Sequence, residues 1–261
     1  MADFRVDGRS APSAATDLFF EIARCANVKA HFEETTTPEQ LRCREVIVTQ
    51  KAPTLADFQV PEPWCGDIES APILFVSSNP SIDEQSLAFA SDPDSELWDS
   101  HVNLFFDKRW SRDGIYTVVS DGERSTDWVR YWAGARARAA ELLRRAPNAG
   151  RDYALTEVVH CKSRDEDGVM GALPECARRY LRRVLALSSA HVIVIFGDTA
   201  WRLMSDIFGI SGSARVSGPL EIEGHQRMVV CLPHPNARKA RTVRALVREE
   251  DLKRIQAFLS R

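Results

Sequence analysis

The chain has 261 residues, of which 44% are hydrophobic and 27% are charged, and its formal net charge is −3. This length suits one sizeable domain or two small ones, and we expect one. Because the apolar runs are too short to cross a bilayer and the N-terminal sequence lacks the apolar core of a secretory signal, we expect a soluble cytoplasmic protein. The mild acidity argues against bulk binding of polyanions, although a basic cluster near the C-terminus allows a local nucleic-acid footprint.

Two helices are predicted ahead of the first strand. Residues 12–29 carry apolar side chains at helical spacing. A second helix starts at Thr37, because Thr37 and Gln40 have the spacing of a capping box. No change in composition marks a domain boundary after these helices. We therefore expect a single domain, in which residues 1–60 form a helical extension packed on a core at residues 65–261.

Four buried strands are predicted from short apolar runs that end in polar or turn residues. They cover residues 73–76, 153–159, 191–197 and 226–232, the last in a hairpin with residues 220–223. Helices are predicted between and after these strands, at residues 126–143, 175–188, 201–208 and 241–259. Strands that alternate with helices form a parallel-rich sheet covered on both faces. The expected fold is therefore α/β, a three-layer α/β/α domain around a central, mainly parallel four-stranded sheet.

Polar residues or a glycine stand at the end of each predicted strand. Asn79 follows the first strand, Glu157 and His160 end the second, Gly197 ends the third and His234 follows the fourth. Because the carboxyl ends of parallel strands share one edge of a sheet, ligands commonly bind there. Any single motif, such as Ser-Asn-Pro, can be plain turn chemistry. Four motifs on one edge predict a site.

The order of these motifs resembles the uracil-DNA glycosylase superfamily, in a divergent bacterial-type branch. In that superfamily the first strand ends in a motif such as Gly-x-Asn/Asp-Pro, a middle strand carries a polar base reader and a His-Pro loop closes the site. The segment Ser77-Ser78-Asn79-Pro80-Ser81 is similar to the first motif, and His234-Pro235-Asn236-Ala237 is similar to the last. The resemblance covers residues 65–260. It implies a uracil-DNA glycosylase-like fold and a location in the bacterial cytosol or nucleoid.

The resemblance also implies an activity, which is hydrolysis of the N-glycosidic bond of uracil, or of a related deaminated base, in DNA. The base would be flipped out of the helix, and an abasic site would remain. Asn79 would position the water, and His234 would donate a hydrogen bond to the departing base. Ser78 would contact the base, while Ser81 and Asn236 would contact the DNA. The expected partner is DNA, and the expected state is a monomer.

Two positions depart from the superfamily pattern. Ser77 stands where a glycine is usual, which changes how closely the backbone approaches the base or sugar. Glu157 stands where the base reader is often Asn. An ionised carboxylate only accepts hydrogen bonds, so it suits the N3–H of uracil but repels O4. Either Glu157 is protonated, or it has another role, or the base preference differs.

Two groups of residues are candidates to hold the DNA and the flipped base. Basic residues follow the His-Pro motif and would bind phosphates, or they are simply a solvated helix face: Arg238, Lys239 and Arg241. Three phenylalanines follow the first motif, and any of them could stack on the base or belong to the core: Phe89, Phe105 and Phe106. Trp128 and Trp132 lie on one face of the helix predicted at residues 126–143, a pattern more typical of core than of a ligand platform.

The six cysteines contain no CxxC pair, so a disulfide framework is not expected. Cys161 and Cys176 stand where some branches of the superfamily bind an iron-sulfur cluster together with an N-terminal cysteine pair. The N-terminal candidates here, Cys25 and Cys43, are far apart in the sequence. We therefore expect no cofactor, with a 4Fe-4S cluster on these four cysteines as the alternative.

Two other functions compete with the DNA glycosylase. A non-catalytic nucleic-acid-binding protein of the same fold would retain the basic loop but lack base reading at Glu157. A hydrolase of free nucleosides or nucleotides would not need the arginine cluster.

Overall fold

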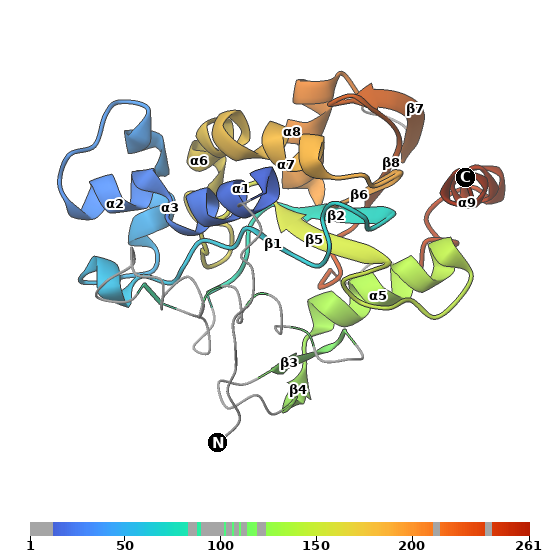
Figure 1. Cartoon of the computed structure of the whole chain (residues 1–261), viewed down its shortest axis with the longest axis horizontal. Helices are drawn as coiled ribbons and strands as arrows, with labels where there is room; N and C mark the ends of the chain where they lie inside the picture. The colour runs from blue at the N-terminus through green and yellow to red at the C-terminus, as the bar shows by residue number, and fades with distance from the viewer. Residues whose placement is uncertain are drawn as a thin grey trace.

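The computed structural model describes residues 13–82, 88–89, 102, 106, 110, 114–118, 124–210, 215–237 and 242–261. Within them the main sheet has six strands in the order β1-β5-β2-β6-β8-β7 (Figure 1). These strands are β1 (Trp64–Cys65), β2 (Ile73–Ser77), β5 (Tyr153–Glu157), β6 (Val192–Phe196), β7 (Val216–Ile222) and β8 (His225–Leu232). A separate two-stranded sheet holds β3 (Tyr116–Val118) and β4 (Arg124–Trp128).

The centre of the main sheet is parallel, as the sequence predicts. Strands β5, β2, β6 and β8 pair in parallel and correspond to the four predicted strands. The two edge strands are antiparallel, with β1 paired to β5 and β7 paired to β8. Strand β7 extends the predicted hairpin arm, and β1 has no counterpart among the predicted strands. Two antiparallel edges thus widen the expected sheet without changing its class.

Helices cover both faces of this sheet. On one face, Leu74 and Val76 belong to a buried cluster with α1 (Ala14–Ala23), α2 (Ala26–Phe32), α3 (Arg44–Val48), α6 (Val169–Cys176), α7 (Arg182–Leu187) and α8 (Asp198–Phe208). On the other face, Ile73 and Phe75 pack with α5 (Arg130–Leu143) and α9 (Glu249–Leu259). Because alternate strand residues face opposite covered layers, the central strands are apolar over long runs, at residues 73–76 of β2 and throughout β6. The predicted mixed α/β class with its N-terminal helices is confirmed.

The N-terminal region contains more elements than predicted. The helix expected at residues 12–29 divides into α1 and α2, because the chain turns at Cys25, whose buried Sγ accepts a hydrogen bond from the Tyr180 hydroxyl at 3.4 Å. The capping box is present, since Thr37 N donates to Gln40 Oε1 at 2.7 Å and Gln40 N donates to Thr37 Oγ1 at 3.4 Å. The 3-10 helix η1 (Gln40–Cys43) follows this box and leads into α3. A second 3-10 helix, η2 (Leu55–Asp57), precedes β1.

The helix predicted from residue 126 starts later, at Arg130. Residues 124–128 form β4 instead, because Trp128 pairs with Tyr116 of β3 across an antiparallel ladder. Trp128 is 57% exposed, so its predicted place in the core is wrong. Trp132, a residue of α5, is buried against the sheet, as expected.

Two other helix boundaries also differ. The helix expected from Glu175 begins at Val169, directly after Gly168 in a left-handed turn, and includes Pro174. It continues through the π-helical turn η3 (Ala177–Leu181) into α7. The C-terminal helix α9 begins at Glu249 rather than near residue 241. The preceding segment turns because Val243 N and Arg244 N each donate to the Glu141 carboxylate at 3.1 Å. Of the helices that the structure describes, none has the length and hydrophobicity needed to span a bilayer.

Candidate active site

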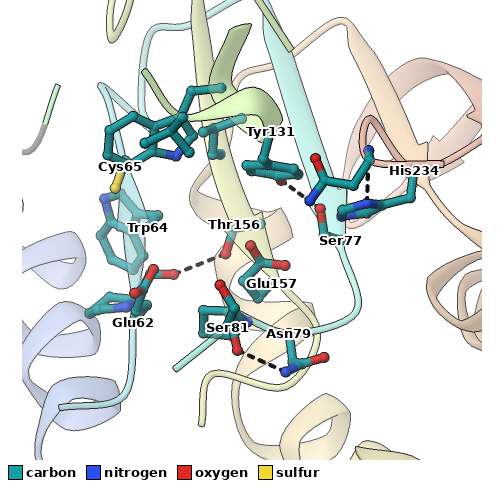
Figure 2. A pocket seen from close by; sticks show the side chains of 16 residues that line it. Glu62, Trp64, Cys65, Ser77, Asn79, Ser81, Tyr131, Thr156, Glu157 and His234 are labelled. Carbon is teal, nitrogen blue, oxygen red and sulfur yellow. Dashed lines mark hydrogen bonds between the residues drawn. The ribbon is translucent and has the colours of Figure 1, made fainter. Parts of the chain in front are cut away.

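A pocket of about 180 Å³ opens beyond the carboxyl ends of β2 and β5 (Figure 2). Asn79, Pro80 and Ser81 reach it from the end of β2, and Glu157 reaches it from the end of β5. The other lining residues come from the segment around β1, from the start of α5 and from the loop after β8: Glu62, Pro63, Trp64, Cys65, Val129, Tyr131, Trp132, His234 and Asn236, together with the strand residues Ser77, Leu155 and Thr156. Asn79, Glu157 and His234, which are distant in sequence, therefore share one cavity.

Asn79 is held by its own turn. Its Nδ2 donates to the carbonyl oxygen of Pro80 at 2.8 Å. This bond uses one of the two N–H groups of the amide, and Oδ1 lies on the opposite side of the amide, as Figure 2 shows. Asn79 thus keeps Oδ1 as a hydrogen-bond acceptor and its second N–H as a donor.

His234 presents a defined tautomer to the pocket. The backbone N–H of Asn236 donates to His234 Nδ1 at 3.3 Å, so the neutral ring carries its hydrogen on Nε2. Burial lowers the pKa of His234 below its usual value; the charge of Glu166 opposes this shift and that of Arg138 adds to it. A neutral imidazole with an Nε2–H donor is therefore the form near neutral pH.

Tyr131 supports His234 and also contacts the first motif. Its ring stacks on the His234 ring, with centroids 5.3 Å apart and planes inclined by 19°. Its hydroxyl lies 2.5 Å from Ser77 Oγ (Figure 2). Burial, and next the negative charge of Glu157, raise the pKa of Tyr131 well above its usual value, so the phenol keeps its proton. Ser77, the residue that replaces the usual glycine, is thus bonded to a residue of α5.

Glu157 is the last residue of β5 and is only 8% exposed. It pairs with Ser77 in the parallel ladder, and the ladder continues past it because Val158 N donates to Ser77 O at 2.9 Å. Rigid backbone on both sides therefore fixes the carboxyl group at the pocket wall.

A second carboxylate, Glu62, lines the pocket and is paired with Lys162. Both side chains are buried, and Lys162 Nζ donates to Glu62 Oε1. The backbone N–H of Glu62 donates to His160 O at 2.9 Å, and His160 Nδ1 donates to Glu62 O at 2.6 Å. Burial lowers the pKa of His160 to about 4, so this histidine is a neutral support and does not line the pocket. Glu62 stands alone between two prolines in the sequence, so no motif marks it as a site residue.

Two of the three phenylalanine candidates, Phe89 and Phe106, do not line the pocket. Phe89 and Phe106 are core residues, 5% and 4% exposed, which pack on Phe58 and Phe19 respectively. Phe105 lies outside the described residues. The aromatic side chains that line the pocket are Trp64, Tyr131 and Trp132. Sequence reasoning missed this wall because helical periodicity assigned the α5 aromatics to the core.

The remaining predicted contacts are divided between the pocket and its surroundings. Ser81 and Asn236 line the pocket. Ser78 instead donates its hydroxyl to Glu166 Oε1, while Glu166 Oε2 accepts from Thr199 Oγ1 at 2.9 Å. Ser78 therefore ties the first motif to the start of α8. Arg238, Lys239 and Arg241 lie outside the described residues.

The family model for the uracil DNA glycosylase superfamily matches residues 63–257. The chain belongs to this superfamily. A search of curated proteins gave no match. Of the pocket residues that the structure describes, the matched range includes all except Glu62, which immediately precedes it. Membership of the uracil DNA glycosylase superfamily supports a glycosylase-type enzyme that acts on DNA.

The four cysteines suggested by the resemblance lie in one buried group. All are free thiols, and Cys43 and Cys176 share a hydrogen bond that lowers the pKa of Cys43 and raises that of Cys176. Each of the six pairs among Cys25, Cys43, Cys161 and Cys176 interacts electrostatically or through this bond. Within the described part of the chain, no group of three or more His, Cys, Asp or Glu side chains is arranged to hold a metal ion. Cysteine thiolates are the usual ligands of iron-sulfur clusters, so the four buried thiols have the donor chemistry of the alternative considered above.

Proposed function

We propose that this protein hydrolyses the N-glycosidic bond of uracil, or of a related deaminated base, in DNA and leaves an abasic site. The observation that carries the proposal is the meeting of the Asn79 acceptor and the His234 Nε2–H donor in one pocket at the strand ends. Membership of the superfamily supports the same conclusion. We further propose that the enzyme acts as a monomer in the bacterial cytosol.

The reaction builds charge of opposite sign at two places. The sugar becomes cationic and the base leaves as an anion, so a donor at the base and an oriented water at the sugar both lower the barrier. His234 Nε2–H would donate to the oxygen of the departing base. Asn79 Oδ1 would accept a hydrogen bond from the water and aim it at the sugar carbon, without acting as a strong base.

The base must leave the duplex to reach this chemistry. The pocket is recessed at the edge of the sheet between β1, β2, β5 and the start of α5, so a stacked and paired base cannot enter it. Trp64 and Trp132, rather than Phe89 or Phe106, are the proposed aromatic faces beside the flipped base. Glu157 would face its hydrogen-bonding edge.

Incubation with a uracil-containing oligonucleotide, followed by alkaline cleavage of abasic sites, tests the proposal. The wild-type chain should cut only the uracil strand. Asn79→Ala should lose on the order of 100-fold or more in single-turnover rate while DNA affinity stays close to that of the wild type. A matched oligonucleotide with thymine in place of uracil controls for contaminating nucleases. Absence of cleavage by the wild type on uracil, hypoxanthine and xanthine substrates would reject the proposed activity, and normal cleavage by Asn79→Ala would reject the role of Asn79.

A further inference from the structure

One face of α5 lies against three consecutive residues of the loop that carries His234. Tyr131, Gly134 and Arg138 are three and four residues apart and therefore share this face. Tyr131 stacks on His234, as described above. The other two residues contact the prolines on either side of that histidine.

Gly134 allows the close approach. A Cβ atom at this position would lie 2.6 Å from Cβ of Pro235, closer than carbon atoms pack. Any larger residue would therefore push Pro235, and His234 with it, away from the helix. The absence of a side chain at Gly134 therefore allows α5 and the Pro233–Pro235 loop to lie this close together.

Arg138 fixes the other end of the loop. Its side chain is almost fully buried, at 2% exposed, and its Nη2 donates to the carbonyl oxygen of Pro233 at 3.2 Å. Its guanidinium carbon lies 4.9 Å from the ring centroid of Phe196, at the end of β6. A buried arginine is costly unless it is paired, and an apolar side chain would fill the same space. Arg138 instead places its cation against the loop that carries His234.

We infer that Arg138 is a positioning residue, which together with Gly134 holds the Pro233–Pro235 loop so that His234 presents Nε2 to the pocket. The expected loss of catalysis rests on the proposed function, whereas the expected change in the pKa of His234 does not. Among the residues that the structure describes, the charged or titratable groups that face His234 are Tyr131 and Arg138 from α5 and Glu166 from the loop before α6. Arg138 disfavours the imidazolium and Glu166 favours it, so removal of the arginine charge raises the pKa of His234.

The test compares Arg138→Met, Arg138→Lys and Gly134→Ala in the full chain by NMR titration of the His234 ring, which is assigned with a His234 variant. Arg138→Met should raise the pKa of His234, and Arg138→Lys should keep it close to the wild-type value because the charge remains. On a uracil substrate, Arg138→Met and Gly134→Ala should each lower kcat on the order of 10- to 100-fold with little change in KM, since a small displacement of the donor weakens transition-state contacts. Arg138→Lys should recover part of the loss.

Arg227 supplies a matched control. It is also fully buried, and its Nη2 donates to Leu185 O at 2.7 Å and also to Ser188 O, away from the pocket. Arg227→Met should destabilise the fold but leave the pKa of His234 and kcat unchanged.

An unchanged His234 titration in Arg138→Met, or an equal shift in Arg227→Met, would overturn the inference. If Arg138→Met does not fold, Gly134→Ala and Arg138→Lys decide the question, because an unaltered kcat in both would overturn it. A wild-type protein that does not cleave uracil would reject the proposed function, and the titration would still judge the inference.

Discussion

His234→Phe isolates the proposed donor from the packing around it. Phenylalanine keeps an aromatic ring to stack on Tyr131, where the two centroids now lie 5.3 Å apart, but it removes both ring nitrogens. The variant therefore loses the Nε2–H that is proposed to meet the departing base and the Nδ1 that accepts from Asn236 N at 3.3 Å. One preorganised donor to a developing anion is worth about 3–4 kcal/mol, which corresponds to a loss of roughly 10²- to 10³-fold in the chemical step.

Single-turnover cleavage of a uracil oligonucleotide, measured across pH, is the assay. In the wild type, protonation would place a hydrogen on Nδ1 and break its bond to Asn236, so the rate should fall below the pKa of His234. Because burial lowers that pKa, the fall should begin below about pH 6.5. The variant should be slow at every pH and lack this acid limb. Tyr131→Phe, which removes only the hydroxyl bonded to Ser77, should lose much less activity. Cleavage by His234→Phe within about threefold of the wild type would refute the donor role, since that corresponds to well under 1 kcal/mol.

Three further predictions concern the base, the cysteines and the DNA backbone. Glu157→Gln should keep uracil cleavage and remove any decline in rate at high pH, because glutamine permanently supplies the donor that a protonated carboxyl group offers to O4. A loss of rate at every pH would instead show that Glu157 acts as an ionised carboxylate. Protein purified without oxygen should contain no stoichiometric iron or acid-labile sulfide, because we expect no cofactor. Iron and sulfide that are lost in Cys43→Ala but kept when the buried Cys231 is replaced by alanine would instead show the alternative, a cluster on the four cysteines. Replacement of Arg238 and Lys239 by alanine should weaken binding to all DNA sequences alike and make the salt dependence of binding shallower. Filter binding at several salt concentrations can measure this dependence. If affinity falls equally with salt in the variant and the wild type, these side chains are only a solvated surface.

Local sequence patterns predicted the centre of the sheet and the polar end of each parallel strand. The apolar runs at β2 and β6 leave little choice of structure, because both faces of these strands are covered. Asn79, Glu157 and His234 could be placed together for the same reason, since parallel strands deliver their ends to one edge. The edge strand β1 escaped prediction because its two residues are too few to show alternation.

What the sequence did not predict depends on contacts between distant segments. Strand β4 forms because it pairs with β3, which outweighs the helical pattern that runs on into α5. Tyr131 has the spacing of a core residue, and only the stacked His234 ring, about a hundred positions later, gives it another role. The grouping of Cys25 with Cys43 likewise arises from the turn at the end of α1 and has no local spacing signal.

The contribution of α1, α2 and α3 to the core has a consequence for anyone shortening this chain. These helices lie ahead of residue 63, where the family match begins, yet they insert Leu18, Ile22, Val28, Val46 and Ile47 into the cluster beneath β2. At about 1.5–3 kcal/mol for each buried side chain, their removal would forfeit roughly 7–15 kcal/mol, comparable to the whole stability of a typical domain. A fragment trimmed to residues 63–257 should therefore aggregate on expression, and the recognisable evolutionary unit is smaller than the unit that must fold.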